Sequence, residues 1–508
     1  MLLLDVVQVS AAVAATRSRK AKVTAIADLL RRAREDTASL ETVVAYVGGS
    51  LRQRRTGLGY RGLSHLPEPA AAATLTVETV DAAFESLAAL SGPGSQAARS
   101  AAVAALFGAA THVEQPWLRA LVTGEVRQGA SDALVQEAVA VVADVPVAAV
   151  RRAAMLAGST LPVVRPAFEG GVEALATIRL EVGRPVLPML ASSATTVAEA
   201  LAKIAVEAGA ASIDTKLDGI RIQVHRQDDD VLVVTRSLDD ITDRLPEVVA
   251  LARSLDAESF VLDGEALALG PDGRPRPFQE TSSRTGTHGG DSDVAVTPYF
   301  FDVLHLDGRD LLDSPGHERD AALEALVPVE HRVARLITSD PAAAEAFASE
   351  AVRAGHEGVV VKDRSAPYAA GRRGAAWVKV KPVHTLDLVV LAVEWGSGRR
   401  KGWLSNIHLG ARDPERPGEF VMLGKTFKGM TDEILAWQTE RFQELETSRN
   451  DWVVSVRPEQ VVEIAFDGVQ RSTRYPGGVA LRFARVIRYR DDKRADEADT
   501  IESVRSLL

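Results

Sequence analysis

Lys216 lies in the segment 215–221, TKLDGIR, which joins a possible nucleophile to a carboxylate, a turn and a second cation. A lysine amine can attack an electrophilic phosphorus once it has lost its proton, whereas a guanidinium stays protonated and cannot. The chain has 11 lysines against 48 arginines, and none between Lys22 and Lys203. A lysine retained in such a chain is a candidate nucleophile. Taken alone, the segment could equally be a strand connection with Asp-Gly as its turn.

Four further segments with charged or aromatic residues follow in order. They are DGE at 263–265, YFFD at 299–302, EGVVVK at 357–362 and WVKVKP at 377–382. Carboxylates such as Glu265 and Glu357 can hold Mg²⁺ near phosphate oxygens. Each segment alone is also compatible with surface charges or a core aromatic, but their succession in one region favours a shared site.

In this order the segments resemble the motifs of the covalent nucleotidyltransferases, which comprise ATP-dependent DNA ligases, RNA ligases and mRNA capping enzymes. LRFARV at 481–486, with DDK at 491–493, resembles the motif on that family's C-terminal barrel. The lysine motif is common to all three classes and does not choose among them. LVTGEVRQGA at 121–130, GRPVLPMLA at 183–191 and YPGGVALRF at 475–483 are similar to segments of replicative-type bacterial and archaeal DNA ligases, in particular the actinobacterial B-type enzymes.

The resemblance implies a role for each residue at a matching position. Lys216 would capture AMP from ATP, releasing pyrophosphate, and Mg²⁺ would be the metal cofactor, held by Glu265, Glu357 and Asp218. The implied ATP-binding residues are Asp214, Arg221, Arg236, Glu265, Phe301, Arg373, Lys379, Lys381, Arg482 and Arg485.

Some of these implied roles carry open questions. Phe301 would stack on adenine, although an aromatic in YFFDVL is as compatible with a core position. Asp214 stands where many relatives have Glu, and whether its shorter side chain reaches the nucleotide is left open. Because a free lysine has a pKa near 10.4, Mg²⁺ and cations such as Arg221 or Lys379 would have to favour the neutral amine of Lys216.

The C-terminal arginines imply motion. Arg482 and Arg485 could reach ATP only if their domain closed over the nucleotide, with a hinge between 382 and 387. The AMP would then pass to the 5′-phosphate of a DNA nick, and attack by the 3′-hydroxyl would seal it.

The pattern along the chain changes twice, which predicts a multidomain protein. Residues 1–185 are rich in Ala, Leu and Val at helical spacing, as in TVDAAFESLAAL at 79–90, and predict an all-α domain, which the resemblance makes DNA-binding. Prolines at 162, 166, 185 and 188 indicate a linker-like passage at its end. Residues 186–384 alternate strands and helices and predict an α+β nucleotidyltransferase, or adenylation, domain, with a hairpin beginning at IRIQVH, 220–225.

Residues 385–508 contain five predicted strands, among them LRFARVIRY at 481–489, and one helix at 431–445. This content is typical of a small β-barrel of the oligonucleotide-binding type, or OB-fold.

The net charge of −10 argues against a uniformly basic nucleic-acid coat, so local clusters must carry any DNA contact. The DNA-binding candidates are Arg52, Arg54, Arg55, Arg61 and Arg127. A solvated basic face is the simpler alternative. The chain has no cysteine, which excludes disulfides, thiolate zinc sites and cysteine nucleophiles, and counts against the NAD-dependent ligases with their four-cysteine zinc site.

Location and partners follow from the same composition. No run approaches the roughly 20 apolar residues of a membrane span, and the N-terminus is apolar before it is basic, unlike a secretory signal. We expect a cytoplasmic, nucleoid-associated monomer whose partner is nicked duplex DNA and which does not contact a membrane.

Three functions are compatible with the sequence: a DNA ligase, an enzyme acting on RNA ends, and a nick-binding protein without catalysis. The ligase-like N-terminal segments disfavour the second, and the retained lysines and carboxylates disfavour the third. GKT at 424–426 is no P-loop, because five residues rather than four separate Gly418 from Gly424. GSGRRKG at 396–402 is expected to be a loop that could touch phosphates.

Overall fold

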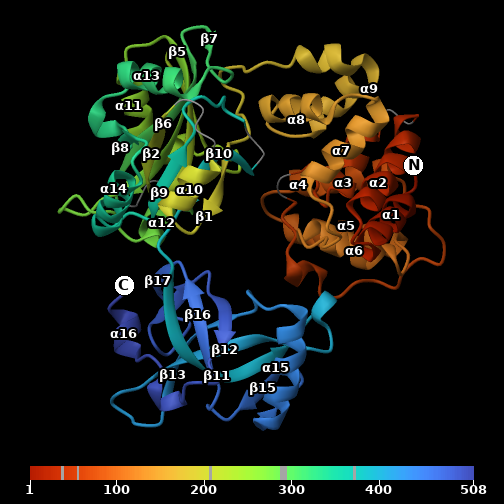
Figure 1. Ribbon diagram of the computed structural model, residues 1–508. Helices are drawn as coiled ribbons and strands as arrows, with labels where there is room; N and C mark the ends of the chain where they lie inside the picture. Colours follow the sequence, from red (N-terminus) through yellow and green to blue (C-terminus); the bar gives the residue numbers. More distant parts are fainter. Residues whose placement is uncertain (36–38, 54–55, 205–208, 287–293, 370–372) are drawn as a thin grey trace.

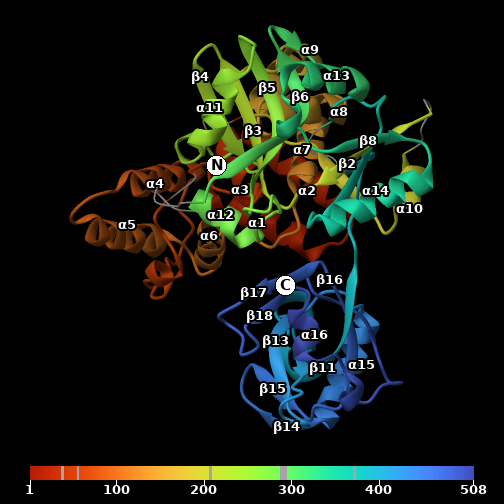
Figure 2. The same cartoon turned by 90° about the vertical axis from the view of Figure 1, so that its left-hand side faces the viewer.

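The three sequence patterns correspond to three regions of the fold, which lie next to one another in the computed structural model (Figure 1). It describes residues 1–35, 39–53, 56–204, 209–286, 294–369 and 373–508, and it does not describe the side chains of residues 285–286 and 373–375. The helical region and the middle region lie side by side, and the strand-rich C-terminal region lies below them in both views (Figures 1 and 2). In the part of the chain that is described, no helix combines the length and apolarity needed to cross a membrane.

The first region is all-α, as predicted. Its helices bury their apolar faces in one continuous core that runs from Leu3 to Leu175. Their bounds are α1 Leu3–Ala15, α2 Arg19–Arg34, α3 Leu40–Val47, η1 Tyr60–Leu63, α4 Val77–Ala89, α5 Ser95–Ala109, α6 Glu114–Val122, α7 Asp132–Ala143, α8 Val147–Leu156 and α9 Leu161–Ala176.

The prediction of a linker-like passage is wrong at its start, because Pro162 and Pro166 lie inside α9. Pro162 stands in the first turn, where a backbone N–H has no partner within the helix. The helix therefore tolerates a proline there, which lacks this N–H. The helical path breaks instead at Gly171, whose φ of 59° and ψ of −144° are not helical. Pro185 and Pro188 lie in irregular chain, as expected.

The middle region is α+β and contains two five-stranded sheets within the described residues. The first sheet has the order β1-β10-β9-β2-β8 and the second the order β4-β3-β5-β6-β7. The strands are β1 Leu190–Ala194, β2 Ala211–Lys216, β3 Ile220–Gln227, β4 Asp230–Thr235, β5 Ser259–Ala268, β6 Val296–Leu306, β7 Arg309–Asp310, β8 Arg335–Thr338, β9 Gly358–Lys362 and β10 Arg373–Val380. The helices are α10 Val197–Lys203, η2 Thr242–Arg244, α11 Pro246–Ser254, α12 Phe278–Gly286, α13 Gly316–Leu326, η3 Val329–His331 and α14 Pro341–Arg353.

The connection from β2 to β3 places the lysine motif. Strand β2 belongs to the first sheet and β3 to the second, so the residues after Lys216 cross from one sheet to the other. Strands β3 and β4 form the predicted hairpin, with Asp228 in the left-handed conformation at its turn. The motif therefore stands where the two sheets meet.

The C-terminal region is strand-rich, as predicted, and has its own apolar core from Leu386 to Val504. Its main sheet has the order β13-β12-β11-β15-β14, with β16 paired to β11 and to β19, and β17 pairs with β18 separately. Its elements are β11 His384–Trp395, η4 Gly398–Arg400, β12 Leu404–Arg412, β13 Phe420–Thr426, α15 Asp432–Glu444, β14 Glu446–Arg449, β15 Val453–Val456, β16 Val461–Phe466, β17 Gly468–Arg471, β18 Val479–Arg482, β19 Arg485–Tyr489, η5 Ala495–Glu497 and α16 Ile501–Arg505.

Several details differ from the sequence prediction. Strands β14, β15 and β17 and helix α16 lie outside the five strands and one helix that were predicted. Among the described residues the strands do not close into a single barrel sheet. The predicted strand 481–489 is two strands, because Phe483 adopts a φ of 55° and ends the extended run between β18 and β19. A positive φ in a bulky residue interrupts strand pairing.

Candidate active site

Lys216 is the last residue of β2 and faces Glu357, which precedes β9. The Glu357 N–H donates to the Lys216 carbonyl oxygen at 2.9 Å, and Lys216 stands opposite Gly358 in the ladder. The Nζ of Lys216 forms an ion pair with one oxygen of the Glu357 carboxylate, and the Nζ of Lys381 binds the other. Backbone pairing thus brings one carboxylate between two lysine amines.

Two glycines make this close arrangement possible. A Cβ on Gly219 would lie 2.3 Å from the carbonyl oxygen of Ala266, and one on Gly358 would lie 2.2 Å from that of Val380. Gly358 also has a φ of +133°, which side-chain-bearing residues rarely adopt. The Asp-Gly and Glu-Gly pairs of the motifs are therefore steric requirements of the site.

A cavity of about 740 Å³ opens at Lys216, between the middle region and the C-terminal region. It brings together nearly all of the predicted catalytic, ATP-binding and metal-binding residues whose side chains are described. Those that line it are Asp214, Lys216, Asp218, Arg221, Arg236, Glu265, Phe301, Glu357, Lys379, Lys381 and Arg482. Arg485 is predicted as well but contacts Asp467, which lines the cavity in its place. The side chain of Arg373 lies outside the described residues.

Phe301 gives the cavity an aromatic surface flanked by cations. Its ring packs edge-on against Trp377 at 6.0 Å between centroids. The Nζ of Lys362 lies 4.9 Å from the Phe301 centroid, and the guanidinium of Arg221 lies 5.5 Å from it. Such a fixed ring can stack on a nucleobase.

Asp214, 2% exposed, is held by two cations. Arg335 donates to both of its carboxylate oxygens at 2.5 and 2.8 Å, and the Nζ of Lys362 lies 2.7 Å away. Burial alone would raise the pKa of Asp214, but Lys362 and Arg335 outweigh it and lower that pKa. The carboxylate is therefore ionised and bound by these two cations.

Arg221 is likewise engaged within the protein. Its guanidinium donates to both oxygens of the buried Asp263, at 3.0 and 2.7 Å, and to the carbonyl oxygen of Met189 at 2.7 Å. The Tyr368 hydroxyl donates to the same carboxylate at 2.7 Å and accepts the Met189 N–H at 2.9 Å. This network fastens the segment around Met189 to the second sheet.

Glu265 is a carboxyl poised between its two protonation states. Burial raises its pKa to about 7, although the nearby Lys216 opposes the shift. One of its oxygens accepts the Gly219 N–H at 3.0 Å. A carboxyl with this pKa exchanges its proton readily for a bound cation near neutral pH.

The three predicted metal ligands have separate partners. Glu357 binds two lysines, Glu265 binds the Gly219 backbone, and Asp218 accepts from Arg482 at 2.5 Å. Within the described residues, no group of three or more His, Cys, Asp or Glu side chains is arranged to hold a metal ion. The oxygen-only donor set that faces the cavity nevertheless suits Mg²⁺.

The predicted DNA-binding arginines differ in their surroundings. Arg52 donates to both oxygens of Asp81, with a shortest distance of 2.6 Å. Arg54 and Arg55 lie outside the described residues. Arg61 and Arg127 are exposed.

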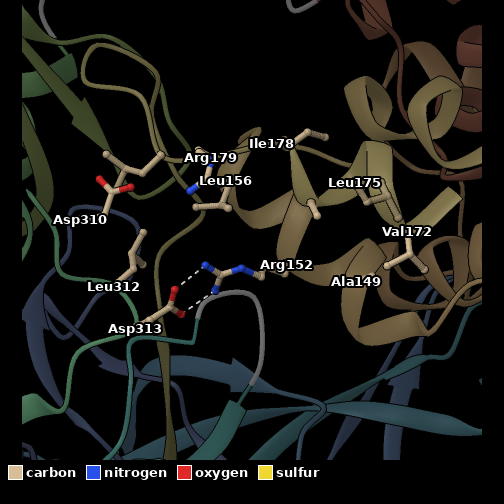
Figure 3. Close-up of a pocket in the computed structure, with 12 residues that line it drawn as sticks. Ala149, Arg152, Leu156, Val172, Leu175, Ile178, Arg179, Asp310, Leu312 and Asp313 are labelled. Atoms are coloured by element: carbon tan, nitrogen blue, oxygen red, sulfur yellow. Dashed lines mark hydrogen bonds and ion pairs between the residues drawn. The ribbon is translucent and has the colours of Figure 1, made fainter. Parts of the chain in front are cut away.

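A second cavity, of about 300 Å³, lies where α8 and α9 meet the middle region (Figure 3). Arg152 points across it to Asp313 and donates to both carboxylate oxygens at 2.7 and 2.6 Å. Apolar residues such as Leu156 and Leu312 complete its wall. Because both charged partners are at least half exposed, the ion pair contributes little stability. None of the lining residues belongs to the lysine motifs, so this cavity is a contact between regions and not a reactive site.

Comparison with known proteins identifies the family. Residues 63–140 match the DNA ligase N terminus, residues 188–381 the ATP dependent DNA ligase domain, and residues 400–493 the ATP dependent DNA ligase C terminal region. A probable DNA ligase of Nocardioides sp. is 70% identical over 100% of this chain and 99% of its own length. The chain belongs to the ATP-dependent DNA ligases.

Other relatives agree with this ligase assignment. A probable DNA ligase of Kineococcus radiotolerans is 67% identical over the full length of both chains. The solved structure Pmar-Lig_PreS3 superposes with a TM-score of 0.63, covers 96% of this chain and 99% of its own, and is 18% identical. At that identity it shows the likeness of the fold.

Enzymes of this family use ATP and Mg²⁺ to seal nicks in DNA through a lysyl-AMP intermediate. Of the three functions compatible with the sequence, the DNA ligase is therefore confirmed. The sequence did not predict three residues that support the site through contacts within it or beside it: Arg335, Tyr368 and Asp467. Arg335 and Tyr368 lie outside the recognised segments, and Asp467 stands before a glycine, a pair typical of ordinary turns.

Proposed function

We propose that Lys216 is the residue that becomes adenylated in this DNA ligase. The supporting observation is that Lys216 lines the cavity and that its amine shares the Glu357 carboxylate with Lys381. The Glu357 carboxylate, which Lys381 also binds, thereby fixes the position of the Lys216 nitrogen at the cavity.

The first step forms one bond and breaks another. The neutral Nζ of Lys216 attacks the α-phosphorus of ATP, the bond from that phosphorus to the bridging oxygen breaks, and pyrophosphate leaves. The nitrogen loses one N–H proton to solvent as the phosphoramidate forms. Lys379, Lys381 and Arg482 line the cavity and stabilise the charge that develops on the phosphate oxygens. Phe301 holds the base, and Arg236 and Arg221 line the same cavity.

Glu265, Glu357 and Asp218 would hold the Mg²⁺ of the family. When bound, Mg²⁺ neutralises phosphate charge and stabilises the transition state. The raised pKa of Glu265, about 7, supports this role, since a cation nearby would replace its proton.

The second and third steps act on DNA. An oxygen of the 5′-phosphate attacks the phosphorus of lysyl-AMP, and Lys216 leaves as an amine that regains a proton. The 3′-hydroxyl then attacks the 5′-phosphorus and loses its proton to solvent. The bond from this phosphorus to the oxygen that bridges it to the adenylate breaks, and AMP leaves with that oxygen.

The regions divide this work. We propose that residues 1–185 bind DNA, with Arg61, Arg127 and Arg52 among the contacts, that 186–384 form the adenylation domain, and that 385–508 form an OB-fold. The hydrogen-bonding of β16 to both β11 and β19 is compatible with a partly open barrel of that type. Acting on chromosomal nicks, the ligase would work as a cytoplasmic, nucleoid-associated monomer.

Labelling with α-³²P-ATP and Mg²⁺, followed by denaturing electrophoresis, tests the assignment of the nucleophile. Wild type should carry label that nicked DNA discharges, and Lys216→Ala should carry none while still binding the nick. The matched control is Lys203→Ala, a lysine that is also ion-paired to a glutamate but lies on α10. Equal labelling of Lys216→Ala would disprove the assignment, and discharge by nicked RNA alone would point to an RNA substrate.

A further inference from the structure

We propose that Asp467 is a positioning residue for lysine adenylation, which holds Lys381 and docks the C-terminal region on the nucleotide cavity. The proposal rests on the function assigned to Lys216. Asp467 lies between β16 and β17, in the C-terminal region, and lines the same cavity as Lys216. Its Oδ2 lies 3.6 Å from the Nζ of Lys381, and its Oδ1 lies 3.5 Å from a guanidinium nitrogen of Arg485.

Asp467 is rigidly linked to Arg482. The Asp467 N–H donates to the Arg482 carbonyl oxygen at 3.0 Å, and the next residue, Gly468, stands opposite Arg482 in the β17–β18 ladder. Arg482 in turn donates to Asp218 of the middle region at 2.5 Å. The two side chains therefore approach the middle region as a unit.

The two contacts have opposite polarity. Arg482, at the end of β18, pairs as a cation with the anion Asp218. Asp467, next to the start of β17, pairs as an anion with the cation Lys381. A partner surface with the charges arranged otherwise would bring like charges together. The crossed pairs thus specify one docked orientation of the C-terminal region.

Asp467 also balances the positive charge of the docked arrangement. Lys216 and Lys381 already share Glu357, and docking brings Arg482 and Arg485 toward them. Without the Asp467 carboxylate, Lys381 and Arg485 would lose the anion that they share. Neutralising Asp467 should therefore weaken docking and leave Lys381 held from one side, by Glu357.

The contact exists only while the C-terminal region covers the cavity, so its loss should affect one step of the reaction. Lysine adenylation needs the covered cavity, because Arg482 reaches the nucleotide site only then. Sealing of a nick that already carries 5′-adenylate needs neither ATP nor pyrophosphate release. An effect on adenylation alone separates a positioning role from a general structural one.

The test compares full-length wild type, Asp467→Asn and Asp467→Glu after removal of bound AMP with pyrophosphate. Asp467→Asn should form lysyl-AMP about fivefold more slowly, equivalent to the loss of one ion-pair contact in the transition state. Sealing of pre-adenylated nicked DNA should stay within about twofold of wild type. Asp467→Glu keeps the charge and can span the 3.6 Å gap, so it should restore most of the adenylation rate.

Salt gives a second readout. Because the pair is partly exposed, the adenylation rate of wild type should fall more steeply with ionic strength than that of Asp467→Asn. Asp451→Asn, an exposed site between β14 and β15, is the matched control. Unchanged adenylation by Asp467→Asn would overturn the proposal, as would equal losses in both assays. Absence of label on wild type would instead overturn the role of Lys216.

Discussion

Lys216 is joined to Glu357 twice, through the backbone hydrogen bond that Glu357 donates and through the ion pair between their side chains. The two residues are 141 positions apart in the chain, by subtraction of their numbers. Antiparallel pairing of β2 with β9 fixes the separation of amine and carboxylate before any ligand binds. A preset geometry of this kind lowers the cost of ordering the site during reaction.

Glu357→Gln should slow lysyl-AMP formation by at least about a hundredfold, since it removes the proposed metal ligand and the charge that aligns both lysines. The folded state should persist, because the amide occupies the same volume. The measurement is single-turnover labelling with α-³²P-ATP, with Glu345→Gln on the exposed face of α14 as control. A rate within threefold of wild type would contradict the role given to Glu357.

Asp214→Ala should destabilise the adenylation domain by about 3–5 kcal/mol, because it leaves Arg335 and Lys362 buried without their shared carboxylate. The relevant measurement is the urea unfolding transition followed by tryptophan fluorescence, since Trp377 lies beside Lys362. Asp214→Asn should lose less, as it retains hydrogen-bond acceptors. A loss below about 1 kcal/mol for the alanine variant would show that the two cations find other partners.

His225 should make stability depend on pH. The buried ring accepts the Gly183 N–H at Nδ1, 3.1 Å away, and its Nε2–H donates to Gln223 at 2.8 Å. Burial, with a smaller effect of His305, lowers its pKa from 6.5 to about 4. The unfolded chain therefore binds a proton below pH 6.5 that the native protein does not bind until about pH 4, so stability falls across this window as the pH falls.

The loss attributable to His225 should approach about 3 kcal/mol near pH 4, at 1.36 kcal/mol for each pKa unit. Carboxyl groups titrate in the same range, so the difference between wild type and His225→Gln isolates the histidine. The free energy of unfolding of both proteins is measured from pH 7.5 to 4. A difference that does not change with pH would mean that His225 has the same pKa in the native and the unfolded protein.

Local motifs in the sequence predicted that Lys216, Glu265 and Glu357 share one site, and the structure brings all three to one cavity. Each of them stands in a short segment with a recognisable order of residue types. The partners that support the site were not predicted, because Arg335 reaches Asp214, and Asp467 reaches Lys381, through long-range packing that leaves no local pattern.

The fold shows the same division between local and long-range information. Helical spacing and strand alternation predicted the class of all three regions and many of their elements, but not short ones such as β8, β14 and α16. They failed at 162–166, where prolines near a helix start do not end the helix, and at 481–489, where Phe483 interrupts a run that looks continuous. The order of strands within the sheets depends on pairings between distant segments, and the sequence pattern carries no signal for it.

The exposed arginines of the helical region should differ in their contribution to DNA binding according to their neighbours. Arg61 and Arg127 are exposed, whereas both carboxylate oxygens of Asp81 already accept hydrogen bonds from Arg52. A cation that contacts a DNA phosphate releases counterions, so each lost contact lowers the salt dependence of binding by roughly 0.9 in the slope of log K against log salt. Arg61→Ala and Arg127→Ala should each weaken binding to nicked DNA and reduce this slope, while lysyl-AMP formation stays unchanged.

Arg52→Ala should change the slope less, because contact with a phosphate would first require separation from Asp81. Fluorescence anisotropy of a labelled nicked duplex at several salt concentrations gives affinity and slope together. If Arg52→Ala reduced the slope as much as Arg61→Ala, the ion pair with Asp81 would have to open on DNA binding. Slopes equal to wild type in Arg61→Ala and Arg127→Ala would remove both residues from the DNA interface and would place the phosphate contacts elsewhere on the protein.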